Sequence, residues 1–154
     1  MDHSFLQQAI EMAVENVRRG GGPFGALVVK DGVVIAVGAN QVTRTSDPTA
    51  HAEIVAIREA CRVLGNFQLS GCDVYSSCEP CPMCLGALYW ARPARIFFAA
   101  TKDEAAAAGF DDSLIYREIQ VPQSERSIPT IHVADEQAQR PFEEWAGKTD
   151  KTAY

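Results

Sequence analysis

The sequence predicts an α/β protein of the three-layer α/β/α sandwich type, with helices on both faces of a mixed β-sheet. Two apolar runs joined by a tight turn predict an antiparallel hairpin at residues 24–39. Between residues 48 and 100, further apolar runs alternate with helical patterns. Such strand–helix–strand units place parallel strands in one sheet, so the sheet combines both kinds of pairing.

The first elements are a helix and the hairpin. Apolar residues recur at a helical period over residues 5–17, and Gly20-Gly21-Gly22-Pro23 ends that helix. Strands are expected at residues 24–30 and 33–39, with the turn at Asp31-Gly32. Both strands are apolar almost throughout, which predicts that helices cover both faces of the sheet.

The later elements follow the same reasoning. After a loop at residues 40–47, Asp47-Pro48 provides an N-cap and a first-turn proline for a helix to about Leu64. The next expected elements are a strand at 72–76, a helix at 82–91 and a strand at 96–100. Weaker patterns beyond Thr101 favour a helix at 113–118, a strand at 130–133 and a helix at 141–146.

The bulk composition is that of a single globular domain covering residues 1–154. Hydrophobic residues make up 47% of the 154 residues and charged residues 22%, as is common for one core. No apolar stretch is long enough to cross a bilayer and no secretory signal is visible, so a cytoplasmic protein without membrane contact is expected. The net charge of −6 and scattered basic residues argue against a nucleic-acid partner.

Three of the five cysteines recur at every third position, as Cys78, Cys81 and Cys84. An odd number of cysteines without a secretory signal argues against a disulfide framework. Two of them lie in Pro80-Cys81-Pro82-Met83-Cys84, and His51-Ala52-Glu53 lies at the start of an earlier predicted helix. The pair H-x-E and P-C-x-x-C is the signature of zinc-dependent nucleobase deaminases.

The pattern suits a catalytic zinc ion. Two cysteines three residues apart at a helix N-terminus can turn both sulfurs to one point, where the helix dipole favours thiolates. His51, Cys81 and Cys84 are therefore the expected ligands of one Zn²⁺ per subunit, which leaves a fourth position for water. Zinc lowers the pKa of such a water to roughly 7.

Glu53 is the expected catalytic proton shuttle between that water, a ring nitrogen and the departing amine. Residues two apart do not share a face of a regular helix, so His51 must occupy the irregular helix cap if both serve one site. The alternatives are a closed structural zinc site with Cys78 as fourth ligand, and buried cysteines without a metal. A closed structural site does not need a carboxylate two residues from a ligand, so the presence of Glu53 favours the catalytic site.

With these residues the chain resembles the cytidine deaminase-like superfamily and, within it, the bacterial guanine deaminases. The resemblance extends over nearly the whole chain. Beyond the metal motifs it includes Gly22-Pro23-Phe24-Gly25-Ala26, Asp47-Pro48-Thr49-Ala50, Ser77-Cys78-Glu79, Gly109-Phe110-Asp111-Asp112-Ser113 and Lys151-Thr152-Ala153-Tyr154. The Phe-Asp-Asp-Ser segment and the terminal tyrosine favour guanine as the substrate.

The resemblance implies a central five-stranded sheet and a homodimer whose C-terminal segment, about residues 135–154, can be exchanged between subunits. Tyr154 would then close the active site of the partner. The implied reaction converts guanine and water to xanthine and ammonia in purine catabolism or salvage. Related aminotriazines are further candidate substrates, because a slot for an amino-substituted N-heterocycle need not demand the imidazole ring.

The resemblance also implies substrate contacts. Asn40 resembles an asparagine that hydrogen-bonds the base, with a turn residue as the alternative. Phe24 and Trp90 resemble walls of an aromatic slot, with core packing as the alternative. Asp112 resembles a carboxylate that accepts from the N–H edge of guanine, with the N-cap of a helix near Ser113 as the alternative.

Further residues complete the expected site. Ala52 and Tyr154 are the remaining candidate substrate-binding residues. Glu143 is a second candidate catalytic residue that assists proton transfer or substrate binding, and the adjacent Glu144 keeps a solvated helix charge as the alternative. Glu79 abuts the first cysteine ligand and is expected to support it from outside the coordination shell.

Three other functions compete with guanine deamination. A tRNA adenosine deaminase shares both zinc motifs but must capture a flipped nucleotide, a task that favours a basic C-terminal helix. Here the corresponding Pro141-Phe142-Glu143-Glu144-Trp145 is acidic. Cytosine deaminase is a second alternative with the same chemistry. An inactive zinc-binding module is the third, and the intact Glu53 argues against it.

Overall fold

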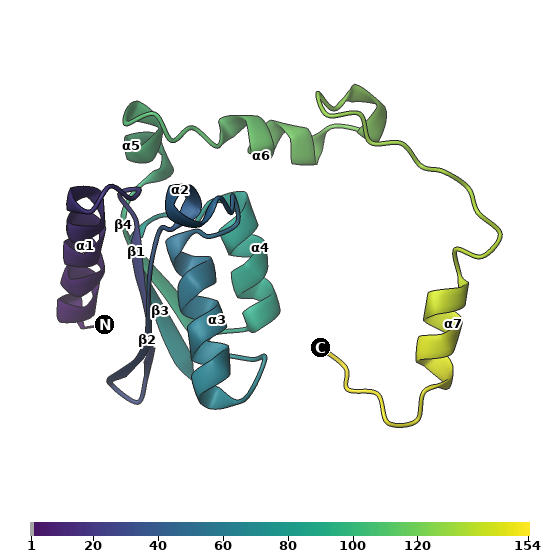
Figure 1. Cartoon of the computed structure of the whole chain (residues 1–154), viewed down its shortest axis with the longest axis horizontal. Coiled ribbons are helices and arrows are strands. Elements are labelled where there is room, and N and C mark those ends of the chain that lie inside the picture. Colours follow the sequence, from purple (N-terminus) through teal and green to yellow (C-terminus); the bar gives the residue numbers. More distant parts are fainter. Residues whose placement is uncertain (1) are drawn as a thin grey trace. The chain divides into compact units, whose positions relative to one another are not determined.

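The computed structural model describes residues 2–154 (Figure 1). Contacts along the chain divide it into two compact units, Met1–Ser113 and Leu114–Tyr154. Within the described residues, every helix is too short or too polar to cross a membrane.

The first unit alternates helices and strands as an α/β protein does. In chain order its elements are α1 (His3–Arg18), β1 (Gly25–Lys30), β2 (Val33–Ala39), α2 (Val42–Thr45), α3 (Ala52–Leu64), β3 (Cys72–Cys78), α4 (Pro82–Ala91), β4 (Arg95–Ala100) and α5 (Lys102–Ala107). The predicted α1, β1, β2, β3, α4 and β4 are all confirmed within two residues at each end.

The strands form one mixed sheet in the order β2-β1-β3-β4. β1 pairs antiparallel with both β2 and β3, whereas β3 and β4 are parallel. The predicted turn between β1 and β2 is confirmed, because Asp31 and Gly32 have φ angles of 50° and 75°, as a type I′ hairpin turn requires. The parallel pair follows from the crossover through α4, which returns the chain to the same edge.

The sheet is the middle layer of three. Ala26 and Val28 of β1 belong to a buried cluster with α3 and α4. The alternate residues Leu27 and Val29 pack instead with Ala9 of α1. Because successive side chains of a strand point to opposite faces, α1 covers one face of the sheet and α3 and α4 the other (Figure 1). The predicted three-layer sandwich is therefore confirmed for this unit.

Three expectations were wrong. The expected loop at 40–47 contains the four-residue helix α2, and the helix expected from Asp47-Pro48 begins only at Ala52. The expected strand at 130–133 is not formed, so the sheet has four strands among the described residues instead of five. A strand needs a neighbour for its backbone hydrogen bonds, and within its own unit this segment has none.

The second unit contains α6 (Ser113–Gln120), the 3₁₀ helix η1 (Gln123–Glu125) and α7 (Arg140–Gly147). The first residue of α6, Ser113, is the last residue of the first unit. These two α-helices confirm the weak patterns near residues 113–118 and 141–146. None of the described residues 114–154 is buried. The unit therefore has secondary structure without a hydrophobic core of its own.

Candidate active site

The three predicted metal ligands converge in the first unit. The ligand atoms of His51, Cys81 and Cys84 all lie within 4.8 Å of one another. His51 Nδ1 is 3.5 Å from each of the two sulfurs. His51 is the N-cap of α3, with φ −68° and ψ 157°, and Cys81 is the N-cap of α4. The prediction that His51 occupies an irregular helix cap is confirmed.

The donor set fits a divalent cation. A hydrogen bond from the Cys84 thiol, helped by the His51 ring, lowers the pKa of Cys81 to about 4. The same bond raises the pKa of Cys84, because two adjacent thiolates repel each other. The Cys81 sulfur in turn raises the pKa of His51. A cation bound between the sulfurs removes their repulsion, as Zn²⁺ does for thiolate pairs.

Glu53 lies beside the ligands and is buried, with only 6% of its surface exposed. Its Oε1 accepts a hydrogen bond from Ser76 Oγ at 3.1 Å, and its Oε2 accepts one from Cys84 Sγ at 3.5 Å. Burial raises the pKa of the Glu53 carboxyl above its ordinary value. A raised pKa makes this carboxyl hold a proton more readily than an exposed glutamate does, which suits a proton shuttle.

Cys78 does not join the cluster. Its Sγ donates to the Thr101 carbonyl oxygen at 3.8 Å, and it is absent from the metal-ligand group found among residues 2–154. Burial raises the pKa of the Cys78 thiol to about 11. The position of Cys78 outside the ligand cluster argues against the alternative of a closed four-ligand site that includes it.

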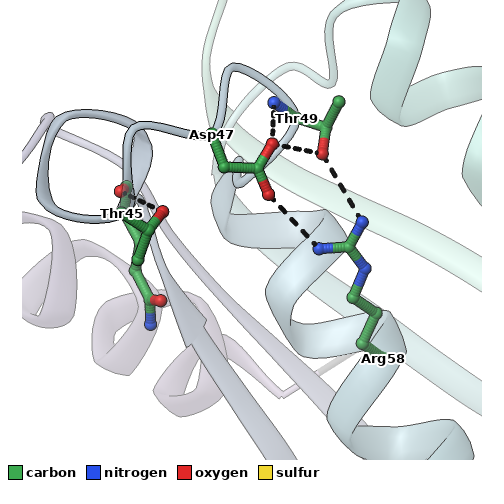
Figure 2. Close-up of polar contacts among 5 residues, drawn as sticks. Thr45, Asp47, Thr49 and Arg58 are labelled. Carbon is green, nitrogen blue, oxygen red and sulfur yellow. Dashed lines mark hydrogen bonds and ion pairs between the residues drawn. The ribbon is translucent and has the colours of Figure 1, made fainter.

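The loop that leads to His51 is held by a carboxylate–guanidinium contact (Figure 2). Asp47 Oδ1 accepts hydrogen bonds from the Thr49 backbone N–H at 2.8 Å and from its hydroxyl at 2.7 Å. Arg58 of α3 lies 3.8 Å from Asp47 Oδ2 and donates to Thr49 Oγ1 at 3.4 Å. The His51 N–H then donates to the Thr49 carbonyl at 2.8 Å. Asp47 thus anchors this loop and does not cap α3 as predicted.

The start of α3 lies directly on β2. A Cβ at Gly38 would come within 2.1 Å of the Ala52 carbonyl oxygen, so only glycine permits this approach. The Ala52 side chain is fully buried in the core. As the first residue of α3, Ala52 has a backbone N–H without an intrahelical acceptor. Any substrate contact of Ala52 therefore comes from its main chain.

Asn40 presents a hydrogen-bond donor directly after the end of β2. It is 7% exposed, and its Oδ1 accepts from the Val42 N–H at 3.2 Å. Its backbone N–H donates to the Phe24 carbonyl at 3.1 Å. Its Nδ2 has no hydrogen-bond partner in the described part of the chain. Because every fully buried side-chain polar atom there is paired, this nitrogen is not fully buried. The Nδ2 is therefore open to a ligand.

An aromatic pair joins two distant segments of the first unit. The Phe24 and Phe110 rings are 5.0 Å apart between centroids and meet edge to face at 88°. Phe24 also packs against the core cluster, as its core-packing alternative predicts, and its role as a wall of a base slot stays a prediction. Phe110 was missed as a site residue, although it lies in the Gly-Phe-Asp-Asp-Ser segment that the resemblance rests on. Only the tertiary contact shows that it lies against Phe24.

Asp112 is electrostatically coupled to the zinc ligands. Burial and the charge of Cys81 raise the pKa of the Asp112 carboxyl, and Asp112 in turn contributes to the raised pKa of Cys78. The Ser113 N–H is bonded by Asp111, and no hydrogen bond from the first turn of α6 to Asp112 is found among the described residues. These contacts argue against the N-cap alternative, and the contact of Asp112 with the base stays a prediction.

The remaining candidates are not brought to this cluster. Trp90 of α4 is 65% exposed, so core packing within this chain is wrong for it. Glu143 is exposed on α7, and Tyr154 is 73% exposed; both belong to the second unit. Glu79 Oε2 accepts from the Lys102 N–H at 3.0 Å, which ties the residue before the cysteine motif to the start of α5.

Comparison with known proteins places these features in a family. Residues 1–100 match the family model of the cytidine and deoxycytidylate deaminase zinc-binding region. Guanine deaminase of Bacillus subtilis (strain 168) is 55% identical over 156 aligned residues, with 100% of both proteins covered. The X-ray structure of guanine deaminase from Bacillus subtilis superposes with a TM-score of 0.98 and covers 100% of this chain and 99% of that one.

Two other relatives match only part of the chain. The tRNA-specific adenosine deaminase of Aquifex aeolicus (strain VF5) is 44% identical and covers 62% of this chain and 64% of that protein. A structure of guanine deaminase from Nitrosomonas europaea is 34% identical with a TM-score of 0.70 and covers 73% of this chain and 65% of that one. Among these proteins, similarity over the full length is found with the Bacillus subtilis guanine deaminase.

Proposed function

Since the chain belongs to the family of zinc-binding cytidine and deoxycytidylate deaminases, we infer that it is a zinc-dependent guanine deaminase. It converts guanine and water to xanthine and ammonia. The observation that carries this conclusion is the convergence of His51, Cys81 and Cys84 beside the buried Glu53. The substrate follows from the 55% identity to a guanine deaminase over the whole of both proteins.

The residues of the site can perform the proton transfers of this hydrolysis. His51, Cys81 and Cys84 would hold a zinc ion, which would supply the activation of a water molecule. Glu53 accepts a proton from that water while the water oxygen bonds to the amino-bearing carbon, and it passes the proton to the adjacent ring nitrogen. Glu53 then takes the remaining proton from the new hydroxyl group and gives it to the amino group, the carbon–nitrogen bond breaks, ammonia leaves and the carbonyl group of xanthine remains. Ser76 and Cys84 hold its two oxygens in position for these steps.

We propose that four groups of the first unit recognise the base. The free Nδ2 of Asn40 donates to an acceptor of the ring, and the Ala52 N–H offers a second donor. Phe24 forms an apolar wall, braced by Phe110. Asp112 accepts from the N–H edge of guanine. A base without those N–H donors leaves the Asp112 carboxylate without a partner, which is how such a site discriminates.

We also propose that a second copy of the chain completes the site. β4 is an edge strand of the sheet among the described residues, so the backbone groups on its outer edge have no strand partner. Ile131 and Val133 are each more than three-quarters exposed, and an apolar segment of this kind needs a surface to cover. Exchange of residues 135–154 in a homodimer would supply Glu143 and Tyr154 from the partner chain and cover Trp90.

The test is ultraviolet absorbance with guanine, cytosine, adenine, an aminotriazine and a tRNA anticodon stem in parallel. The proposed function predicts conversion of guanine to xanthine with release of one ammonia, and loss of that activity after zinc is removed by a chelator. Restored activity on adding Zn²⁺ is the matched control. Activity on the tRNA alone would contradict the substrate assignment and would leave the zinc chemistry intact.

A further inference from the structure

A buried amide on α1 has no part in the zinc chemistry. Asn16 is 5% exposed, and its Nδ2 donates to the carbonyl oxygens of Gly22 at 2.7 Å and of Asn40 at 2.9 Å. Its Oδ1 accepts from Arg44 of α2 at 3.4 Å. Both amide hydrogens are engaged, so the side chain has one orientation. It links α1 to two segments that come later in the sequence.

Two glycines lie against this amide and its neighbour. A Cβ at Gly21 would be 2.5 Å from Asn16 Nδ2, and a Cβ at Gly22 would be 3.0 Å from Asn40 Oδ1. A side chain at Gly21 would therefore collide with the Asn16 amide. The glycine run that ends α1 also serves to let the chain pass over two amide side chains.

The contact with Asn16 helps to set the direction of the Asn40 side chain. The Asn40 backbone is held on one side by its N–H bond to the Phe24 carbonyl and on the other by the bond from Asn16 to its own carbonyl. Its Oδ1 is held by the Val42 N–H. With both backbone groups and Oδ1 fixed, the one remaining donor, Nδ2, points in a defined direction.

We propose that Asn16 is a positioning residue for recognition of the base. It fixes the main chain at Asn40 and at Gly22, and thereby aims Asn40 Nδ2 and the nearby Phe24 at the substrate. The inference rests on the proposed function, in which Asn40 contacts the base. Asn16 itself touches no substrate atom, and the zinc ligands and Glu53 are carried by other elements. Its loss therefore weakens substrate binding and leaves the proton-transfer groups in place.

The test uses five full-length, zinc-loaded variants. Asn16→Asp keeps the shape and the Arg44 contact but turns an acceptor toward the two carbonyls, and Asn16→Ala removes the amide. The variants Asn16→Ala and Asn40→Ala, the double variant Asn16→Ala/Asn40→Ala and the wild type together form a double-mutant cycle. Ala13→Gly, one turn earlier on α1, is the control for loss of helix stability alone. KM and kcat for guanine, zinc content and Tm are measured for each.

We expect both Asn16 variants to raise KM about 10-fold, the size of effect that follows loss of buried hydrogen bonds. We expect kcat to change less than about threefold and zinc to remain at one ion per chain. The double variant should raise KM no further than Asn40→Ala alone, because coupled residues are non-additive. Ala13→Gly should lower Tm without changing KM.

An unchanged KM in both Asn16 variants would overturn the inference. So would an effect of Asn16→Ala that multiplies with that of Asn40→Ala, or an equal rise of KM in Ala13→Gly, because each of these would reduce Asn16 to a structural role. Failure of the proposed function has a different outcome. The wild-type protein would then turn over no guanine, and the role of Asn40 on which this inference rests would fall with it.

Discussion

The two units of the chain differ in how they bury apolar side chains. The first encloses two hydrophobic clusters on the two faces of its sheet. The second has no buried residue in its described part, and its apolar residues, such as Ile128, Ile131, Val133 and Phe142, are each at least 68% exposed. The first unit thus contains its own core, whereas the second needs a surface outside itself to cover its apolar side chains.

The chemistry is divided in the same way. The metal ligands, Glu53, Asn40 and Asp112 all belong to the first unit, whereas Glu143 and Tyr154 belong to the second. We infer that the first unit performs the metal-dependent hydrolysis and that the second closes a site on another copy. Each prediction below either separates the two roles or contradicts their separation.

The largest effect is expected at Glu53. Glu53→Gln removes the proton shuttle and should lower kcat by about 10³-fold or more, near the upper range for general acid–base groups, with zinc content unchanged. Glu59→Gln on the same helix is the control, because its exposed carboxylate only pairs with Arg62 at the surface. A loss equally large in Glu143→Gln would place part of the chemistry in the second unit and contradict the division.

The second effect concerns assembly. Ile131→Lys places a charge on an apolar residue that is 79% exposed in the single chain. If a second copy covers this segment, the dimer has to bury the lysine charge, which is unfavourable. Sedimentation at micromolar concentration should therefore show a shift from dimer to monomer. Glu136→Lys, on an exposed polar position nearby, should remain dimeric. An Ile131→Lys protein that stays dimeric would show that residues 130–133 lie outside the interface.

The third effect concerns zinc affinity. Asp47→Ala removes the acceptor that holds Thr49 and pairs with Arg58, and so loosens the loop that precedes His51. Loss of a group that bonds a metal ligand directly changes metal affinity by about 10–100-fold. Asp47 acts on His51 only through Thr49, so we expect about threefold to tenfold weaker zinc binding in a chelator competition. Asp73→Ala, which removes an ion pair with Arg95 at the start of β3, the end of the strand away from the cysteine motif, should leave zinc affinity unchanged.

The smallest effect is expected at Phe110. Aromatic pairs contribute about 0.5–1.5 kcal/mol beyond the area they bury, so Phe110→Ala should raise KM for guanine about twofold to tenfold, with kcat less affected. Phe67→Ala, which is similarly exposed but lies in the connection after α3, is the control. An equal KM in both variants would mean that the Phe24–Phe110 contact does not shape the slot.

The sequence predicted those parts whose signal is local. The helical period of α1, the turn at Asp31-Gly32 and the spacing of Cys81 and Cys84 each fix geometry within a few residues, and all were confirmed. The start of α3 was predicted too early, because Asp47 bonds Thr49 two residues on instead of capping a helix. A competing local hydrogen bond of this kind has the same sequence pattern as a cap.

The missed features depend on contacts between distant segments. Asn16 bonds Asn40 across 24 residues of sequence, and Phe110 meets Phe24 from the other end of the unit. An asparagine in an amphipathic helix and a phenylalanine after a glycine carry no local sign of these contacts. The expected strand at 130–133 failed for the same reason, because strand formation depends on an available edge and not on β-propensity alone.

The zinc site itself is tested most directly by X-ray absorption at the zinc edge of the purified protein, together with its metal content. We predict one zinc ion per chain, bound by two sulfur atoms at about 2.3 Å and by nitrogen or oxygen at about 2.0–2.1 Å. The His51→Ala variant should lose the nitrogen ligand. Absence of bound zinc, or coordination by three or four sulfurs, would contradict a catalytic metal held by His51, Cys81 and Cys84.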